Sequence, residues 1–138
     1  MAKVDPIVER NEQVVRTFLK GWDTLDLELA MAQVTDDMCY LNQPLEAIRG
    51  KENVVKLIGS ILKLAKKAEF KLLNVIGSGN KVLTERLDCW DWDGSGTWQL
   101  KLPVCGIFEL TPDGKIYEWR ECYDNEHWTK RGGPSLVL

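Results

Sequence analysis

The sequence predicts an α+β fold, in which three helices from the N-terminal half pack on a curved, mixed and mostly antiparallel sheet that forms a cone. In the first half of the chain apolar residues recur mainly at helical spacing, and from Glu69 onward they alternate as in strands. No linker, repeat or low-complexity segment divides the 138 residues, so we expect one domain, residues 1–138. A strongly bent sheet with helices packed against it encloses a pocket, so this fold class predicts a ligand site.

Helical spacing of apolar residues predicts three helices, over residues 6–21, 25–34 and 51–67. Asp5 is suited to cap the first helix, and Pro6 to take its first position. The third helix follows Gly50, and its lysines lie largely on the side opposite its apolar residues. We expect that lysine side to face solvent, as in other amphipathic helices.

Alternating patterns predict five strands, over residues 38–42, 70–76, 82–90, 97–110 and 115–124. The strand over residues 82–90 lies between two Gly-Ser-rich turns and carries Arg86 and Asp88 on the same face as Val82 and Trp90. Charges among apolar neighbours are unfavourable on a half-buried strand unless they have partners or a task. This strand is therefore the first place to look for a site.

Composition excludes several classes of function. The chain is 44% hydrophobic and 28% charged with a net charge of −3, so neither nucleic acid nor an anionic membrane is an expected partner. Its apolar runs are too short to cross a bilayer and its N-terminus has no signal-peptide pattern, so we expect a cytoplasmic protein. The four cysteines are widely spaced, without CxxC, which predicts buried thiols rather than a zinc site.

Five polar residues on the predicted strands could carry chemistry. Tyr40 and Asn42 share one face of the first strand, Arg86 and Asp88 share one face of the 82–90 strand, and Asp124 ends the last strand. The sequence has no serine elbow, no glycine-rich phosphate loop and no cluster with metal-ligand spacing, so no metal or cofactor is predicted. Arg86 and Asp88 could equally be an ion pair within the sheet, with little net effect on stability.

Four motifs place these residues in a wider pattern: Tyr40-x-Asn42, Val82-Leu83-Thr84-Glu85-Arg86-x-Asp88, Val104-Cys105-Gly106-x-Phe108-Glu109, and Asp113-Gly114-x-Ile116 followed by Trp119-Arg120 and Asp124. With them the chain resembles the limonene-1,2-epoxide hydrolase family, within the cone-shaped fold class of nuclear transport factor 2 and ketosteroid isomerase. The fold class hosts many functions. The combination of Arg-x-Asp, Tyr-x-Asn and a late aspartate is more specific.

The resemblance implies one-step opening of an epoxide to a vicinal diol, without a covalent enzyme intermediate. It implies that Asp124 is the general base for a water held by Tyr40 and Asn42, that Asp88 is the general acid, and that Arg86 lies between the two carboxylates. Two ionised carboxylates around one guanidinium carry a net charge of −1, which is costly in a dry pocket. One shared proton makes the group neutral and provides an acid and a base together.

The remaining expectations concern the substrate, the partner and competing functions. We expect an apolar wall to bind a lipophilic epoxide, formed by Trp90, Leu102, Val104 and Phe108. The resemblance also implies a homodimer through the sheet face away from the pocket, and a reaction without cofactor. Two other functions remain open: an isomerase or cyclase that transfers a proton with one carboxylate, and a non-catalytic domain that holds a lipid or steroid.

Overall fold

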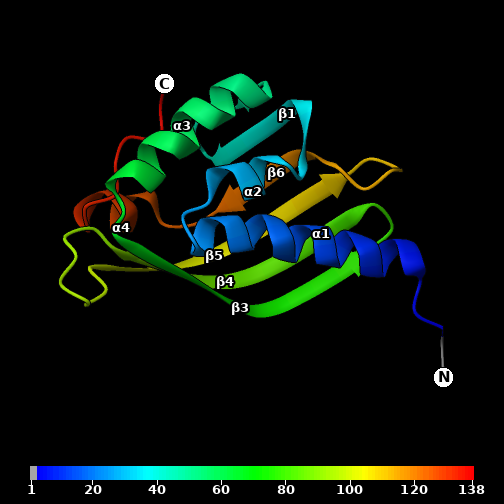
Figure 1. Ribbon diagram of the computed structural model, residues 1–138, viewed down its shortest axis with the longest axis horizontal. Helices are drawn as coiled ribbons and strands as arrows, with labels where there is room; N and C mark the ends of the chain where they lie inside the picture. Colours follow the sequence, from blue (N-terminus) through cyan, green and yellow to red (C-terminus); the bar gives the residue numbers. More distant parts are fainter. Residues whose placement is uncertain (1–2) are drawn as a thin grey trace.

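The computed structural model describes residues 3–138 and confirms the predicted α+β architecture (Figure 1). Its elements in chain order are α1 (Pro6–Asp23), α2 (Leu27–Met31), β1 (Val34–Gln43), β2 (Ile48–Arg49), α3 (Lys51–Leu64), β3 (Lys67–Ser78), β4 (Lys81–Asp91), β5 (Leu100–Leu110), β6 (Ile116–Cys122) and α4 (Asn125–Lys130). None of the helices formed by these residues has both the length and the apolar content needed to cross a bilayer.

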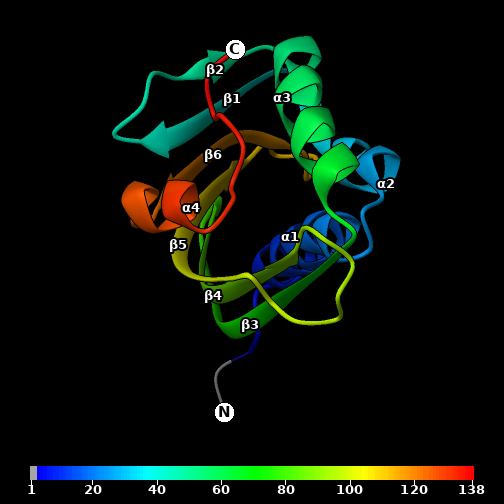
Figure 2. The ribbon, with the colours of Figure 1, turned by 90° about the vertical axis from the view of Figure 1, so that its left-hand side faces the viewer.

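The six strands form one mixed sheet in the order β2-β1-β6-β5-β4-β3. Only β1 and β6 are parallel neighbours, and the other pairs are antiparallel. Figure 2 shows the sheet curling around α1 and α3, with α4 and the C-terminal segment at the end that faces the viewer. The cone is thus bounded by the sheet and two helices, and its contents are the side chains on the concave face.

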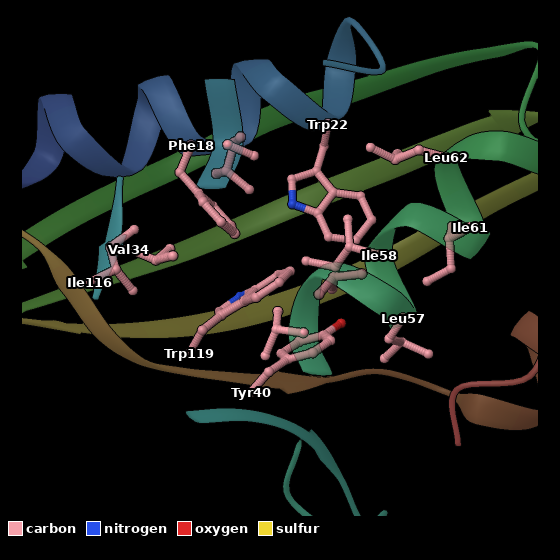
Figure 3. Close-up of a cluster of buried hydrophobic side chains, with 14 of the residues drawn as sticks. Phe18, Trp22, Val34, Tyr40, Leu57, Ile58, Ile61, Leu62, Ile116 and Trp119 are labelled. Atoms are coloured by element: carbon pink, nitrogen blue, oxygen red, sulfur yellow. The ribbon is translucent and has the colours of Figure 1, made fainter. Parts of the chain in front are cut away.

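The core lies between α1, α3 and the concave face of the sheet (Figure 3). Phe18 of α1 is fully buried and packs edge-on against Trp119 of β6, with ring centroids 4.8 Å apart. Trp119 in turn stacks on Tyr40 of β1 at 4.1 Å and 15°. A fully buried side chain of this size contributes about 1.5–3 kcal/mol. This packing fixes the position of the Tyr40 ring through its stacked face.

Tertiary contacts shift several predicted boundaries. The helix predicted over 25–34 is only α2, because β1 already begins at Val34 and pairs with Ile116 of β6. The helix predicted over 51–67 ends at Leu64, since Lys67 begins the ladder between β3 and β4. Two elements were not predicted, the two-residue strand β2 and the short helix α4. The last strand accordingly ends at Cys122 rather than near Asp124.

Two of the four cysteines are exposed on the convex face of the sheet. Cys105 and Cys122 are paired in register on β5 and β6 and are exposed there, whereas Cys39 and Cys89 are buried. The prediction of four buried thiols is therefore wrong for two of them. Strand alternation places Cys105 on the face opposite Val104 and Gly106, which point into the cone.

Candidate active site

One row of registered residues crosses the concave face and explains how the site is assembled. Thr84 of β4 pairs with Gly106 of β5, Gly106 pairs with Glu121 of β6, and Glu121 pairs with Asn42 of β1. Residues that pair directly across strands point to the same face. Glu121 therefore enters the cone beside Asn42, and Arg86, two residues from Thr84, enters it from the facing side.

Arg86 holds two carboxylates at once. Its Nε and Nη2 donate to Asp88 Oδ1 and Oδ2 at 3.0 and 2.9 Å, and Nη2 also donates to Glu121 Oε1 at 2.7 Å. Nη1 donates to the hydroxyl of Thr84 at 3.3 Å, and the guanidinium lies 5.5 Å from the ring centroid of Phe70. With Arg86 1% exposed, this is a buried acid–guanidinium–acid group held by charge-assisted hydrogen bonds.

Gly106 makes room for this group. A Cβ at position 106 would lie 2.8 Å from Arg86 Nη1, 2.8 Å from Glu121 Oε2 and 2.9 Å from Thr84 Oγ1. Any larger residue would force the guanidinium and the carboxylate apart. The motif Val104-Cys105-Gly106 thus needs glycine at its third position because a Cβ there would clash with the charged group.

The structure corrects the predicted position of the second carboxylate. Asp124 is not in the cone: it is the exposed N-cap of α4, and its Oδ1 accepts from the backbone N–H groups of Glu126 and His127 at 3.0 and 3.1 Å. Asp124 lies an odd number of residues beyond Glu121, and successive strand residues point to opposite faces. The chain also leaves the sheet before residue 124, so the carboxylate that meets Arg86 is Glu121.

Tyr40 and Asn42 lie where the sequence placed them, on the concave face of β1. Both are buried. The Oδ1 of Asn42 accepts a hydrogen bond from the hydroxyl of Tyr123 at 3.0 Å. Within residues 3–138, neither Asn42 Nδ2 nor Glu121 Oε2 has a hydrogen-bond partner, although both atoms are buried. A buried donor and a buried acceptor without partners on neighbouring strands indicate a position at which a small polar molecule can bind.

A small cavity of about 30 Å³ reaches both carboxylates. Its polar wall is formed by Tyr40, Asp88, Glu121 and Tyr123, and its apolar wall includes the predicted Trp90, Leu102 and Val104. Phe108 does not line it: that ring is fully buried and stacks on Trp119 at 5.8 Å, so the prediction that Phe108 binds substrate is not supported. Trp128 of α4 and Leu136 also belong to the wall of this cavity.

Burial sets the ionisation of these groups. Burial raises the pKa of Glu121 to about 7, against the opposing effect of the Arg86 charge. Burial also raises the pKa of Asp88, again opposed by Arg86. Burial alone would lower the pKa of Arg86, but the charges of Asp88 and Glu121 raise it above its ordinary value. The guanidinium stays charged while the two carboxyl groups retain one proton between them near neutrality.

The two tyrosines remain neutral donors. Burial, followed by the charge of Glu121, raises the pKa of Tyr40 well above its ordinary value, and the same two causes raise that of Tyr123. Each hydroxyl can therefore donate to a carboxylate, an amide oxygen or a bound water. In the part of the chain that the structure describes, no three His, Cys, Asp or Glu side chains are grouped so as to hold a metal ion.

Sequence reasoning missed Glu121 and Tyr123, but a signal for both was present. Trp119 is an apolar residue of the last strand, and strand alternation places residues 119, 121 and 123 on its face. That alternation would have favoured Glu121 over Asp124. The register between β6 and β5, which brings Glu121 against Gly106, could not be derived from alternation alone.

These features define a class of protein: a cone-shaped α+β domain with a buried acid–arginine–acid group at the base of an apolar cavity. The model of the limonene-1,2-epoxide hydrolase catalytic domain matches residues 9–131. The chain belongs to this family. No curated protein is significantly similar to it in sequence.

Several solved structures share this fold. An LEH-like epoxide hydrolase from M. tuberculosis is 27% identical, with 91% of each chain covered and a TM-score of 0.74. A SnoaL-like protein of the polyketide cyclase type from Jannaschia sp. CCS1 is 20% identical over 98% of this chain and 99% of its own, with a TM-score of 0.80. A protein with a ketosteroid isomerase-like fold from Catenulispora acidiphila is 13% identical, with 90% and 95% coverage and a TM-score of 0.73. The last two show the fold alone.

Proposed function

We propose that this protein is a cofactor-independent epoxide hydrolase that converts a lipophilic epoxide to a vicinal diol in one step. The observation that carries the proposal is the buried Arg86, which is hydrogen-bonded to Asp88 on one side and to Glu121 on the other. The membership of the family and the similarity to the epoxide hydrolase from M. tuberculosis support it.

The two carboxyl groups divide the chemistry. Glu121 is the general base, because it lies in register with Asn42 and two residues beyond Trp119, the register partner of Tyr40. Asp88 is the general acid on the opposite side of Arg86. Each of these functions typically accelerates a reaction by about 10²–10⁴-fold. The pair holds one proton near neutral pH, which is the state that simultaneous acid and base catalysis requires.

The proton count closes over one turnover. Water attacks an epoxide carbon and gives one proton to Glu121, while the C–O bond breaks and the epoxide oxygen takes the proton of Asp88. The diol leaves, Glu121 is then protonated and Asp88 is ionised. One proton must pass from Glu121 back to Asp88, by way of water, before the next turnover. The net charge of the Asp88–Arg86–Glu121 group is zero before and after the reaction.

The attacking water is held by groups from two strands. Tyr40 and Glu121 both line the cavity. Asn42 lies behind the lining residues, in register with Glu121, and within residues 3–138 its Nδ2 has no hydrogen-bond partner. Tyr123 is a positioning residue: by donating to Asn42 Oδ1 it keeps the amide oriented with Nδ2 available. The indole of Trp90 with Leu102 and Val104 forms the apolar wall for the carbon skeleton.

The test is a panel of cyclic and acyclic epoxides, including limonene oxide and cyclohexene oxide, scored for diol and its enantiomeric composition. A single turnover in ¹⁸O-labelled water should place the label in the diol. Label found in an enzyme carboxylate would instead show a covalent route and reject the one-step mechanism.

Proton transfer without hydrolysis is a second candidate, because the cone is also similar to a SnoaL-like protein of the polyketide cyclase type and to a ketosteroid isomerase-like fold. That chemistry needs one carboxylate as base and one donor such as Tyr40. It leaves the second carboxyl group and its bridging arginine without a task. Isomerisation of an enone with no diol from any epoxide would favour this candidate. Retention of a lipid or steroid without turnover would favour a binding domain.

We also propose a homodimer through the convex face of the sheet. A registered row on that face runs across five strands and is apolar apart from one arginine: Ile76, Leu83, Ile107, Arg120 and Leu41. Ile76 is 62% exposed and Leu83 44% exposed in the single chain. A second copy related by a twofold axis would cover this row with the same row, as in the symmetric interfaces common among homodimers.

A further inference from the structure

The C-terminal segment, residues 131–138, crosses the end of the cone that α4 occupies. Figure 2 shows it leaving α4 and running across that end toward β2. Leu136 is buried, 7% exposed, and its side chain is part of the wall of the same cavity that reaches Asp88 and Glu121. The segment therefore contributes to the wall that separates the acid–arginine–acid group from this end of the cone.

The first half of this segment is anchored to α4. The indole Nε1 of Trp128 donates to the carbonyl of Pro134 at 2.8 Å, and the N–H of Gly133 donates to the carbonyl of Trp128 at 3.0 Å. A Cβ at position 133 would lie 2.3 Å from Trp128 Cε2, so only glycine fits against that ring. The backbone is thus held in place as far as Pro134.

The second half, residues 135–138, has almost no polar attachment. Among the described residues, the hydrogen bonds of this stretch join only Ser135 and Val137 to each other. Val137 and Leu138 are 67% and 65% exposed. The side chain of Leu136 is the one group of the stretch that is buried, so displacing it breaks apolar contacts and few hydrogen bonds. Segments of this kind open at low free-energy cost.

With Leu136 in its wall, the cavity is too small for the substrate of the proposed reaction. Its volume of about 30 Å³ accommodates roughly one water molecule. Pockets for small organic ligands usually measure about 300–1,000 Å³. Most of the other wall residues belong to helices and strands of the core, whereas Leu136 belongs to neither. Tyr123, the other wall residue outside these elements, is held by its hydrogen bond to Asn42. Leu136 is thus the part of the wall that can leave without disturbing the sheet.

We propose that residues 135–138 are a cover that turns about Pro134, and that Leu136 occupies part of the volume taken by the substrate. The cover admits an apolar molecule when Leu136 moves out of the cavity, and the volume of the Leu136 side chain limits the size of molecule that fits while the cover is in place. The nature of the reacting molecule rests on the proposed function, whereas the opening of the cavity does not.

Binding of a neutral apolar dye, N-phenyl-1-naphthylamine, tests the opening without any reaction. Leu136→Ala and a chain that ends at Ser135 both keep the Pro134 carbonyl that Trp128 binds. The apparent affinity is proportional to the fraction of molecules that are open, and that fraction is larger when Leu136 is truncated or removed. We therefore expect these variants to bind the dye on the order of tenfold more tightly than wild type. Val137→Ala, the matched control on the neighbouring exposed residue, should bind like wild type.

Two further measurements make the result decisive. Near-ultraviolet circular dichroism establishes that each variant is folded, and Gly133→Ala displaces the segment from Trp128 while Leu136 is kept. Dye affinity at the wild-type value in all folded variants would overturn the proposal. Equal tightening in Val137→Ala would also overturn it, because the effect would then not depend on the buried leucine.

The same variants separate this proposal from the proposed reaction. If epoxides are hydrolysed, kcat/KM for the larger members of the panel should rise about tenfold in Leu136→Ala relative to the smallest member. Diol formation with unchanged dye binding and size preference would reject the cover and leave the reaction standing. Tighter dye binding with no diol from any epoxide would reject the reaction and leave the cover standing.

Discussion

Arg86 Nη2 on β4 lies 2.7 Å from Glu121 Oε1 on β6, although β5 runs between the two strands and the residues are 35 positions apart in the chain. This contact, and not one with Asp124, completes the buried charged group. We therefore expect Glu121→Gln to lower diol formation by about 10²–10⁴-fold, the usual contribution of a general base. Asp124→Asn is the matched control, because asparagine caps a helix as well as aspartate does, and it should keep nearly full activity. The reverse outcome would return the role of base to Asp124.

The shared proton predicts how activity depends on pH. Burial raises the pKa of Glu121 to about 7. Because Glu121 and Asp88 titrate as one coupled pair, the pair loses its shared proton above that pH and with it the general acid. The rate of hydrolysis should therefore fall as pH rises beyond about 7. The measurement is kcat against pH from 5 to 10 with a saturating epoxide. A rate that keeps rising to pH 10 would contradict a shared proton.

Stability should depend on pH through the same group. Because the folded state holds the Glu121 proton more tightly than the unfolded chain, this contribution is fully present below about pH 4.5 and is lost as pH rises to about 7. The loss is on the order of 3 kcal/mol of the free energy of unfolding. Glu121→Gln, which mimics the protonated acid, should lack it, so the variant gains stability relative to wild type between pH 4.5 and 8. Urea unfolding of wild type and Glu121→Gln at pH 4.5 and at pH 8 measures the difference.

Space at Gly106 is required for the charged group. Gly106→Ala would place a methyl group 2.8 Å from Arg86 Nη1, so Arg86 and Glu121 must move apart. We expect diol formation to fall by at least about tenfold, because small misplacements of catalytic groups are costly. Gly59→Ala in α3 is the control: its Cβ would meet only Leu27 at 3.5 Å, and it should stabilise the helix by about 0.5–1 kcal/mol at unchanged activity.

Tyr123 is expected to act through Asn42. Tyr123→Phe removes the hydrogen bond to Asn42 Oδ1 and frees the amide to rotate, so the water loses a fixed donor. The loss of one such bond is about 0.5–1.5 kcal/mol, so kcat should fall by roughly threefold to tenfold with little change in KM. Tyr117→Phe removes a hydroxyl that contacts Glu109 instead and should leave kcat unchanged. Equal effects of the two substitutions would argue against a positioning role.

The apolar row on the convex face predicts a dimer that a charge should break. Leu83→Glu would place a charged carboxylate in the apolar row of each copy, and we expect the variant to sediment at monomer mass. Leu64→Glu is the matched control, because Leu64 is 54% exposed on α3, away from that face. Wild type at monomer mass at micromolar concentration would reject the dimer.

Periodicity in the sequence was enough to predict every helix and strand of the cone except β2 and α4, and to direct Arg86, Asp88, Tyr40 and Asn42 toward the pocket. It could do so because helical and strand periodicities are local, and charges on an otherwise apolar strand face stand out. The choice of Glu121 over Asp124 was also within reach of strand alternation. What alternation could not supply was where the last strand stops.

The contact between Glu121 and Arg86, and the place of Leu136 in the cavity wall, depend on how distant segments pair in the folded chain. The register of β6 against β5 and β1 brings Glu121 between Gly106 and Asn42, and register depends on pairing between strands distant in sequence. The turn at Asp124 starts α4, which sends the chain back across the cone and seats Leu136 in its wall. Contacts between segments this far apart in the chain have no local signature, so they become visible only when the chain is folded.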